Sequence, residues 1–163
     1  KHVHFLLTEH TINYRYPDTK PGEHTNTDMG AGDTIFGDHE TLIKRLPDLL
    51  EKTNKTINEG RLTPIFISAI FHGYFIYLHP FRDGNGRLGR LLSNKILLQA
   101  GLPPLIIKKE DKADYINVMN KLKKEDGSSN LVSYFYHTAI KQMESEIEEK
   151  QRLNEGNNFK DFN

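Results

Sequence analysis

The chain has 163 residues, of which 36% are hydrophobic, and this length suits one compact domain better than two. Its 22 Lys and Arg residues balance 22 Asp and Glu residues, which argues against nonspecific binding to nucleic acid or to an anionic membrane. It contains no Cys, so disulfides, thiolate metal sites and cysteine nucleophiles are excluded, and we expect a cytoplasmic location.

The chain begins Lys1-His2-Val3, without Met, and has neither a signal pattern nor an apolar run of membrane-spanning length. Because Met is missing, we expect a piece of a longer protein. Because no apolar run is long enough, we expect no membrane partner. Residues upstream of Lys1 can then contribute to its function.

The first forty residues predict little regular structure. Residues 4–12 suit the end of a helix, whereas residues 13–32 are rich in Pro, Gly, Asn, Thr and Asp and predict a loop. A short apolar pair between Asp33 and Asp38 predicts a small hairpin, which is too short to be stable without packing on something else.

Three helical patterns follow. Residues 40–58 have an amphipathic period that ends at Gly60, and Pro47 is expected to kink this helix or to start a new one. Thr63 and Pro64 predict the N-cap and first residue of a strongly apolar helix, which we place at the centre of the core. Residues 88–98 predict another largely buried helix, which stops at a glycine followed by two prolines.

Residues 111–124 and 130–153 predict two more helices. Five or so helices with one hairpin, and no run of alternating strands, predict an all-α bundle. We expect a single domain over residues 1–153. A polar tail over residues 154–163 is expected either to dock on that domain or to be disordered.

Residues suited to phosphate binding gather between the two most apolar helices. Gly84 and Gly86 allow the backbone to approach a ligand closely where the second of these helices begins, and the N–H groups of a helix start can bind an anion. Arg87 and Arg90 are three residues apart, so both guanidinium groups can hold phosphate oxygens on the same side. These features predict a polyphosphate site.

Two further side chains add reactive chemistry to this stretch. Asp83 offers the hard oxygen ligand that Mg²⁺ takes together with phosphate oxygens and water. His79 can accept a proton near neutral pH and is the candidate general base. Each residue alone has an ordinary structural explanation, such as a helix cap, a turn or a solvated arginine. Their coincidence within twelve residues indicates a catalytic site for a nucleotide and Mg²⁺.

Two other interpretations of the same residues are weaker. Gly84, Gly86 and Gly89 have the spacing of a dinucleotide-binding fingerprint, but that fingerprint follows a strand, and here a helical pattern precedes it. His72 and His79 are seven residues apart and share a helix face, but two ligands are too few for a metal site.

Residues 79–90 read HPFRDGNGRLGR and match the Fic-family motif HPFx(D/E)GNGRxxR at every defined position. The chain thus resembles the Fic family, and looser similarity extends over residues 4–141. The resemblance implies an α-helical Fic fold in which His79 deprotonates a Tyr, Thr or Ser hydroxyl of a target protein. That oxygen would attack the α-phosphorus of ATP, and pyrophosphate would leave.

The resemblance also implies a role for each polar motif residue. Asp83 would hold Mg²⁺ between the α- and β-phosphates. The backbone of residues 84–86 and the Asn85 side chain would cradle the same two phosphates, and Arg87 and Arg90 would hold the β- and γ-phosphates.

In Fic proteins a hairpin called the flap lies over the active site and pairs with an extended segment of the target. Thr34, Ile35 and Phe36 are the candidates here, and they would dock the target by strand addition. An ordinary packed hairpin is the alternative.

Many Fic proteins are inhibited by a helix bearing (S/T)xxxE(G/N), whose Glu pairs with the second arginine of the motif, here Arg90. No segment fits this pattern fully. Glu155 is followed by the expected glycine, but Gln151 stands where Ser or Thr is required. Glu155 is therefore a candidate inhibitory residue, with a polar helix end as the alternative. The inhibitory helix can also precede Lys1 or belong to a separate protein.

The leading hypothesis is a protein adenylyltransferase that uses ATP and Mg²⁺ and also modifies itself. Transfer of UMP, GMP or phosphate, and removal of AMP from a target, remain alternatives that keep the fold. A non-catalytic module that binds nucleotide or a partner is a further alternative, and the complete motif argues against it. The sequence leaves a homodimer open.

Overall fold

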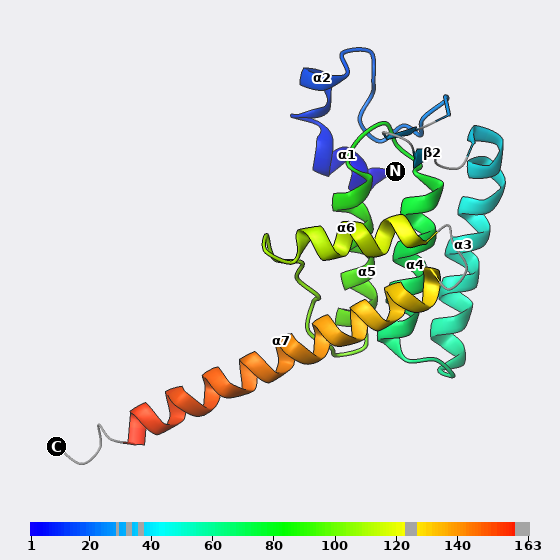
Figure 1. Cartoon of the computed structure of the whole chain (residues 1–163). Helices are drawn as coiled ribbons and strands as arrows, with labels where there is room; N and C mark the ends of the chain where they lie inside the picture. Colours follow the sequence, from blue (N-terminus) through cyan, green and yellow to red (C-terminus); the bar gives the residue numbers. More distant parts are fainter. Residues whose placement is uncertain (29, 32–33, 36–37, 123–126, 159–163) are drawn as a thin grey trace. The chain divides into compact units, whose positions relative to one another are not determined.

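A computed structural model describes the chain except residues 29, 32–33, 36–37, 123–126 and 159–163, and without the side chains of residues 30–31, 34–35, 43 and 155–158 (Figure 1). The described residues form seven helices and two short strands. Their bounds are α1 His2–Thr8, α2 Ile12–Arg15, β1 Gly30–Ala31, β2 Thr34–Ile35, α3 His39–Glu59, α4 Pro64–Leu78, α5 Asn85–Gln99, α6 Lys112–Lys121 and α7 Gly127–Asn158. This helical content confirms the predicted all-α class.

The chain divides into two compact units, residues 1–102 and residues 103–163, which are described separately. The predicted single domain over residues 1–153 stays a prediction. In the described parts of both units, every helix is too short or too polar to span a bilayer.

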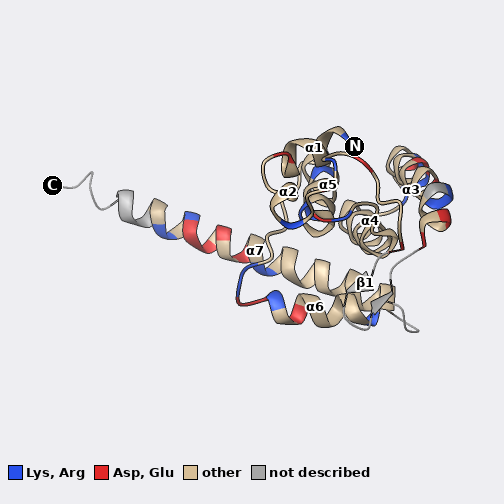
Figure 2. Ribbon diagram, turned by 90° about the horizontal axis from the view of Figure 1, so that it is seen from above, with Lys and Arg blue, Asp and Glu red and all other residues tan. Residues whose placement is uncertain are grey.

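Helix α4 is the central helix of the first unit, as predicted. It packs against both α3 and α5, and Figure 2 shows it without a charged residue. Thr63 caps its start by accepting the Phe66 N–H at 3.3 Å, and Pro64 is its first residue. The core around it consists of Leu42, Leu46, Ile67, Phe71, Phe75, Leu78, Phe81, Leu88 and Ile96. Because Leu78, Phe81 and Leu88 belong to this cluster, the loop between α4 and α5 is anchored in the core.

Helix α3 begins and ends where the sequence predicts, to within a residue. Asp38 accepts the Thr41 N–H at 2.7 Å at its start, and Gly60 ends it in the left-handed conformation with φ 63°. Pro47 lies inside this one continuous helix, so it does not start a new one.

The N-terminal segment differs in detail from the prediction. Helix α1 ends at Thr8, and a four-residue helix, α2, follows in the segment predicted as loop. The antiparallel ladder pairs Gly30 with Ile35 and Ala31 with Thr34. The first strand, β1, lies upstream of the predicted hairpin. The sequence did not indicate it, because Gly30 and Ala31 are small residues without a strand signal.

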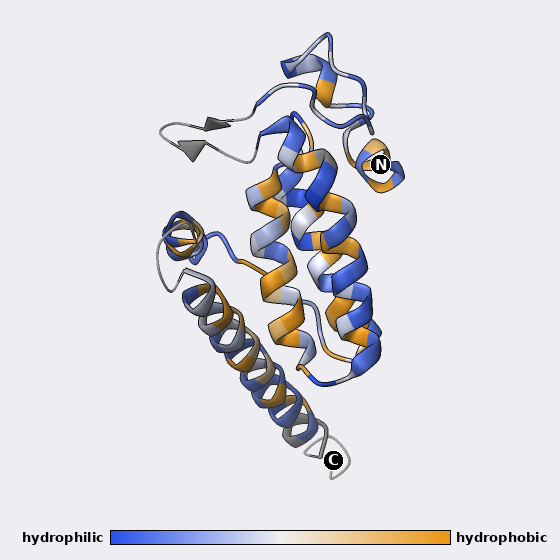
Figure 3. Cartoon of the chain, turned by 90° about the vertical axis from the view of Figure 1, so that its right-hand side faces the viewer, coloured by the Kyte–Doolittle hydropathy of each residue, from blue (hydrophilic) through white to orange (hydrophobic). Residues whose placement is uncertain are grey.

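Helices α6 and α7 pack together in the second unit. The Tyr115 and Tyr134 rings lie 6.2 Å apart, and Lys141 Nζ lies 3.8 Å from Asp111 Oδ1. Figure 3 shows apolar residues interspersed with polar ones along the described part of α7, the long helix that leads to the C-terminus. This helix runs through Asn158, so the first residues of the predicted tail are helical.

Candidate active site

His79 lies at the C-terminal end of α4 with a left-handed backbone, φ 46° and ψ 57°. Among the described residues it is the single non-glycine residue with a positive φ. Its N–H still donates to the Phe75 carbonyl at 3.2 Å, which closes the last turn of the helix. A side chain in this conformation costs about 1 to 2 kcal/mol, and such strain is concentrated at functional sites.

The His79 imidazole is half-buried and held by the backbone of α4. Its Nδ1 lies 3.3 Å from the Ile76 carbonyl oxygen. Because a carbonyl can only accept, Nδ1 carries the proton, and Nε2 is the atom with the lone pair. Burial lowers the pKa of His79, against the raising effects of the Ile76 carbonyl and the Asp83 charge. The ring is therefore neutral at neutral pH, which is the form a general base requires.

The Asn85 side chain closes the loop that follows His79. Asn85 is buried, and its Oδ1 accepts the Phe81 N–H at 3.0 Å while its Nδ2 donates to the Phe81 carbonyl at 2.6 Å. The Thr25 N–H donates to the Pro80 carbonyl at 2.9 Å from outside the loop. The resemblance to the Fic family implies a phosphate contact for Asn85, which stays a prediction. In the structure its amide shapes the loop, and no feature of the sequence pointed to this clasp.

Gly84 forms the start of the candidate anion site. It is the N-cap of α5 with φ 80°, and its N–H donates to Asp83 Oδ1 at 2.7 Å. The positive φ favours glycine, and a Cβ at this position would lie only 3.0 Å from Thr8 Cγ2. The N–H groups of the first turn of α5 have no acceptor within the helix, and they can donate to an anion.

The two arginines of α5 lie at this helix start. Arg87 Nη2 is 3.8 Å from Asp83 Oδ2, and Arg87 Nη1 donates to the Leu7 carbonyl at 3.5 Å. Arg90 Nη1 lies close to Gly86, since a Cβ built there would be 3.4 Å away from it. The structure thus brings Asp83, Gly86 and both guanidinium groups to one end of α5.

Asp83 fits the predicted role in Mg²⁺ binding. Its carboxylate is partly exposed, and its Oδ2 faces the partly exposed Arg87 guanidinium. A single carboxylate beside a phosphate cradle suits Mg²⁺, which takes one or two carboxylates together with phosphate oxygens and water. Among the described residues no group of three His, Cys, Asp or Glu side chains could hold a metal ion.

From the sequence, His72 was a candidate only for a metal site with His79, which has too few ligands. In the structure His72 instead connects the two helices that carry the motif. His72 is buried between α4 and α5, with its Nδ1 3.2 Å from Ser93 Oγ. Burial and the nearby Arg90 charge lower its pKa to about 4, against a hydrogen bond to the Gly89 backbone that raises it. His72 is therefore neutral and links the two helices that carry the motif.

The remaining predicted site residues lie at the edge of what the structure describes. Thr34 and Ile35 form β2, and Phe36 lies outside the described residues. Glu155 belongs to the helical backbone of α7, but its side chain lies outside the described part. The flap and the inhibitory glutamate therefore stay predictions.

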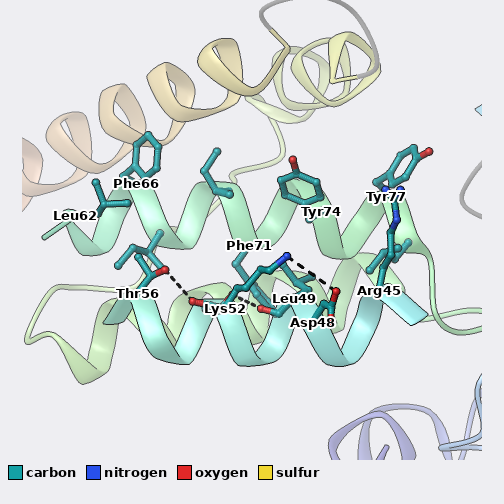
Figure 4. Close-up of a pocket in the computed structure, with 14 residues that line it drawn as sticks. Arg45, Asp48, Leu49, Lys52, Thr56, Leu62, Phe66, Phe71, Tyr74 and Tyr77 are labelled. Atoms are coloured by element: carbon teal, nitrogen blue, oxygen red, sulfur yellow. Dashed lines mark hydrogen bonds and ion pairs between the residues drawn. The ribbon is translucent and has the colours of Figure 1, made fainter. Parts of the chain in front are cut away.

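The described residues of the first unit line a groove and a second, more polar hollow. A groove of about 540 Å³ between α3 and α4 is lined largely by apolar and aromatic side chains, and the ion pair between Asp48 and Lys52 lies at its edge (Figure 4). It contains no residue from His79 to Arg90. The second hollow, of about 580 Å³, is lined by residues 15–20 and 23–27 and by Arg82, which lies over the Tyr16 ring. Of these two hollows, the polar one borders the motif loop through Arg82.

Comparisons with known proteins agree with this fold. A model of the Fic/DOC family matches residues 1–97. The protein adenylyltransferase Fic of Nematostella vectensis is 43% identical over 82 residues, which cover 46% of this chain and 19% of that protein. The chain spans about a fifth of the length of the curated relatives it matches.

Solved structures extend the similarity beyond the segment that the family model matches. A Fic domain containing signaling protein from Bacteroides thetaiotaomicron superposes with a TM-score of 0.67 and 27% identity, over 75% of this chain and 52% of that one. IbpAFic2 covalently tethered to Cdc42 superposes with a TM-score of 0.60 and 27% identity, over 76% and 43%. Because the family model covers more than half of the chain and the helical fold agrees with it, the chain belongs to the Fic/DOC family.

Proposed function

We propose that this chain transfers AMP from ATP to a hydroxyl group of a target protein, and also to itself. The observation that carries the proposal is the neutral His79 imidazole, whose Nδ1 donates to the Ile76 carbonyl. It lies six residues before the start of α5, and the first turns of that helix carry Arg87 and Arg90. Relatives named protein adenylyltransferase support the same activity.

His79 Nε2 takes the proton of the target hydroxyl in this reaction. The resulting oxygen forms a bond to the α-phosphorus of ATP, the bond from that phosphorus to the bridging oxygen breaks, and pyrophosphate leaves. The proton stays on His79, and the Ile76 carbonyl stabilises the charged ring by accepting from Nδ1. His79 thus acts as base without leaving its position on α4.

The start of α5 holds the nucleotide. The backbone N–H groups of Asn85 and Gly86 and the guanidinium groups of Arg87 and Arg90 donate to phosphate oxygens. The Gly84 N–H beside them is held by Asp83 Oδ1. Asp83 would hold Mg²⁺, which would neutralise phosphate charge. The Asn85 clasp keeps the loop in the shape that these contacts need.

The target protein docks on the hairpin that contains Thr34, Ile35 and Phe36. In the described residues β1 and β2 pair with each other over two residues each, so a target segment can add along an edge of this ladder. IbpAFic2, which was solved tethered to Cdc42, supports a protein as the acceptor.

Intact-mass spectrometry after incubation with ATP and Mg²⁺ tests the reaction. We expect a gain of one AMP by the wild-type chain and none by His79→Ala, with the affinity for ATP unchanged within a few fold. His10→Ala is the matched control because His10 is an exposed histidine outside the site, and it should be modified like the wild type.

Other outcomes select the alternatives. Equal modification of His79→Ala would exclude this residue as the base. A gain of one phosphate, or a gain with UTP or GTP instead of ATP, would identify a different transferred group. A chain that binds ATP but shows no transfer from any nucleotide, even to the proteins of a cell extract, would be a non-catalytic nucleotide-binding module.

A further inference from the structure

His4 lies beneath the motif loop, 79 residues upstream of its contact there. It is fully buried on α1, and its Nε2 lies 2.9 Å from the Asp83 carbonyl oxygen. Its Nδ1 accepts the Gly22 N–H at 3.0 Å. Because a carbonyl only accepts and an N–H only donates, a single tautomer, with the proton on Nε2, satisfies both contacts.

The His4 ring also contacts the hydrophobic part of the loop. It stacks on Phe81 with ring centroids 3.8 Å apart and an interplanar angle of 6°. A Cβ on Gly84 would lie 3.4 Å from its Nε2, so the ring lies against the first residue of the helix start as well. Thr8 Oγ1 donates to the His4 carbonyl at 2.7 Å and fixes the turn of α1 that carries the ring.

These contacts fix the orientation of one peptide group. The Asp83 carbonyl and the Gly84 N–H belong to the same planar unit, so a bond to the carbonyl also sets the direction of that N–H. The N–H donates to Asp83 Oδ1, and Gly84 then begins α5 with φ 80°. Rotation of this peptide would displace both the Asp83 carboxylate and the N–H groups that follow.

We propose that His4 is a positioning residue for the transfer reaction, because its ring holds the Asp83–Gly84 peptide in the orientation that presents the start of α5 to the nucleotide phosphates. This inference rests on the proposed function. It assigns to α1 a part in catalysis, although His4 itself does not touch the reacting atoms.

Four substitutions test the contacts separately. His4→Phe keeps the stack on Phe81 but removes both hydrogen bonds. His4→Gln places an amide near the position of Nε2 and can restore the bond to Asp83, whereas His4→Asn reaches only the position of Nδ1. His10→Phe is the exposed control.

The measurements are ATP affinity with and without Mg²⁺, kcat and KM for ATP, and thermal unfolding. We expect His4→Phe to lose at least tenfold in kcat/KM for ATP and in Mg²⁺-dependent ATP affinity at temperatures where it is folded. His4→Gln should recover several-fold more of both than His4→Asn, and His10→Phe should match the wild type.

Wild-type kcat/KM and ATP affinity in folded His4→Phe would overturn the proposal. If His4→Phe does not fold, the comparison of His4→Gln with His4→Asn tests the proposal. Equal kcat/KM and ATP affinity in these two variants, with unequal stability, would show that His4 is purely structural. ATP affinity does not require catalysis. If the wild type binds ATP but transfers nothing, the affinity series still tests His4 while the proposed activity fails.

Discussion

Gly84 is constrained both by its own backbone and by its neighbours. Its φ is 80°, and an added Cβ would meet Thr8 Cγ2 at 3.0 Å, a contact that real Cβ atoms rarely make. We expect Gly84→Ala to lower the free energy of unfolding by about 1 to 2 kcal/mol for the left-handed backbone, and by about 1 kcal/mol or more for the crowding. Urea unfolding measures this loss.

Gly60→Ala is the matched control for the backbone effect. Gly60 has φ 63° at the end of α3, and nothing lies within 4 Å of an added Cβ. The control should therefore lose about 1 to 2 kcal/mol only, from the backbone. Equal losses in the two variants would contradict the close packing of α1 under Gly84.

The sequence proposes the residues of the site but not their contacts. The motif from His79 to Arg90 offers a candidate base, a carboxylate and two guanidinium groups, because these residues are close together in the chain. The left-handed backbone of His79 and the contact of His4 with Asp83 were not predictable. They depend on how α1, α4 and α5 pack, and no local pattern encodes that.

Pro47 and Pro64 occupy different positions in their helices and should respond differently to replacement. Pro47 lies exposed inside α3, where proline cannot donate to the carbonyl four residues earlier. We expect Pro47→Ala to raise the free energy of unfolding by about 1 to 3 kcal/mol, because an alanine restores this hydrogen bond. Thermal unfolding measures the gain.

Pro64→Ala provides the comparison. Pro64 is the first residue of α4, where an N–H has no acceptor within the helix, so its replacement should give no gain in stability. If both alanine variants are stabilised alike, the missing hydrogen bond in α3 is not the cause.

Among the elements, α3 and α4 were predictable because their ends carry cap residues. Gly60 and Thr63 act in the structure as predicted, and Asp38, which was expected to end the hairpin, caps the start of α3. Strand β1 was missed because its pairing with β2 is a tertiary contact of two small residues. The end of α7 was missed because its last turns are polar and carry no apolar period.

Buried histidines should make the stability of the folded chain depend on pH. The pKa of His72 is lowered from its ordinary value of 6.5 to about 4, mainly by burial. As the pH falls below 6.5 the unfolded chain takes up a proton that the folded chain does not, so folding becomes less favourable. The loss between pH 6.5 and 4 is on the order of 3 kcal/mol for this one group.

His72→Asn tests this prediction in a series of unfolding experiments across the same pH window. The asparagine amide can still pair with Ser93 but does not titrate, so the variant should have a shallower dependence of stability on pH. His4, His24 and His79 also have lowered pKa values and contribute in the same direction, so some dependence should remain. An unchanged slope would show that His72 does not contribute.

The order of the helices around the loop has an electrostatic consequence for the whole molecule. Helix α4 ends at Leu78 and α5 begins at Asn85, so the carbonyl end of one helix and the amide end of the next face the same short loop. Aligned peptide dipoles give these ends partial negative and partial positive charge. The proposed base, His79, lies at the pole that favours an added proton, and the proposed phosphate cradle lies at the pole that favours an anion. The backbone alone thus separates the proton-accepting side of the loop from the anion-binding side.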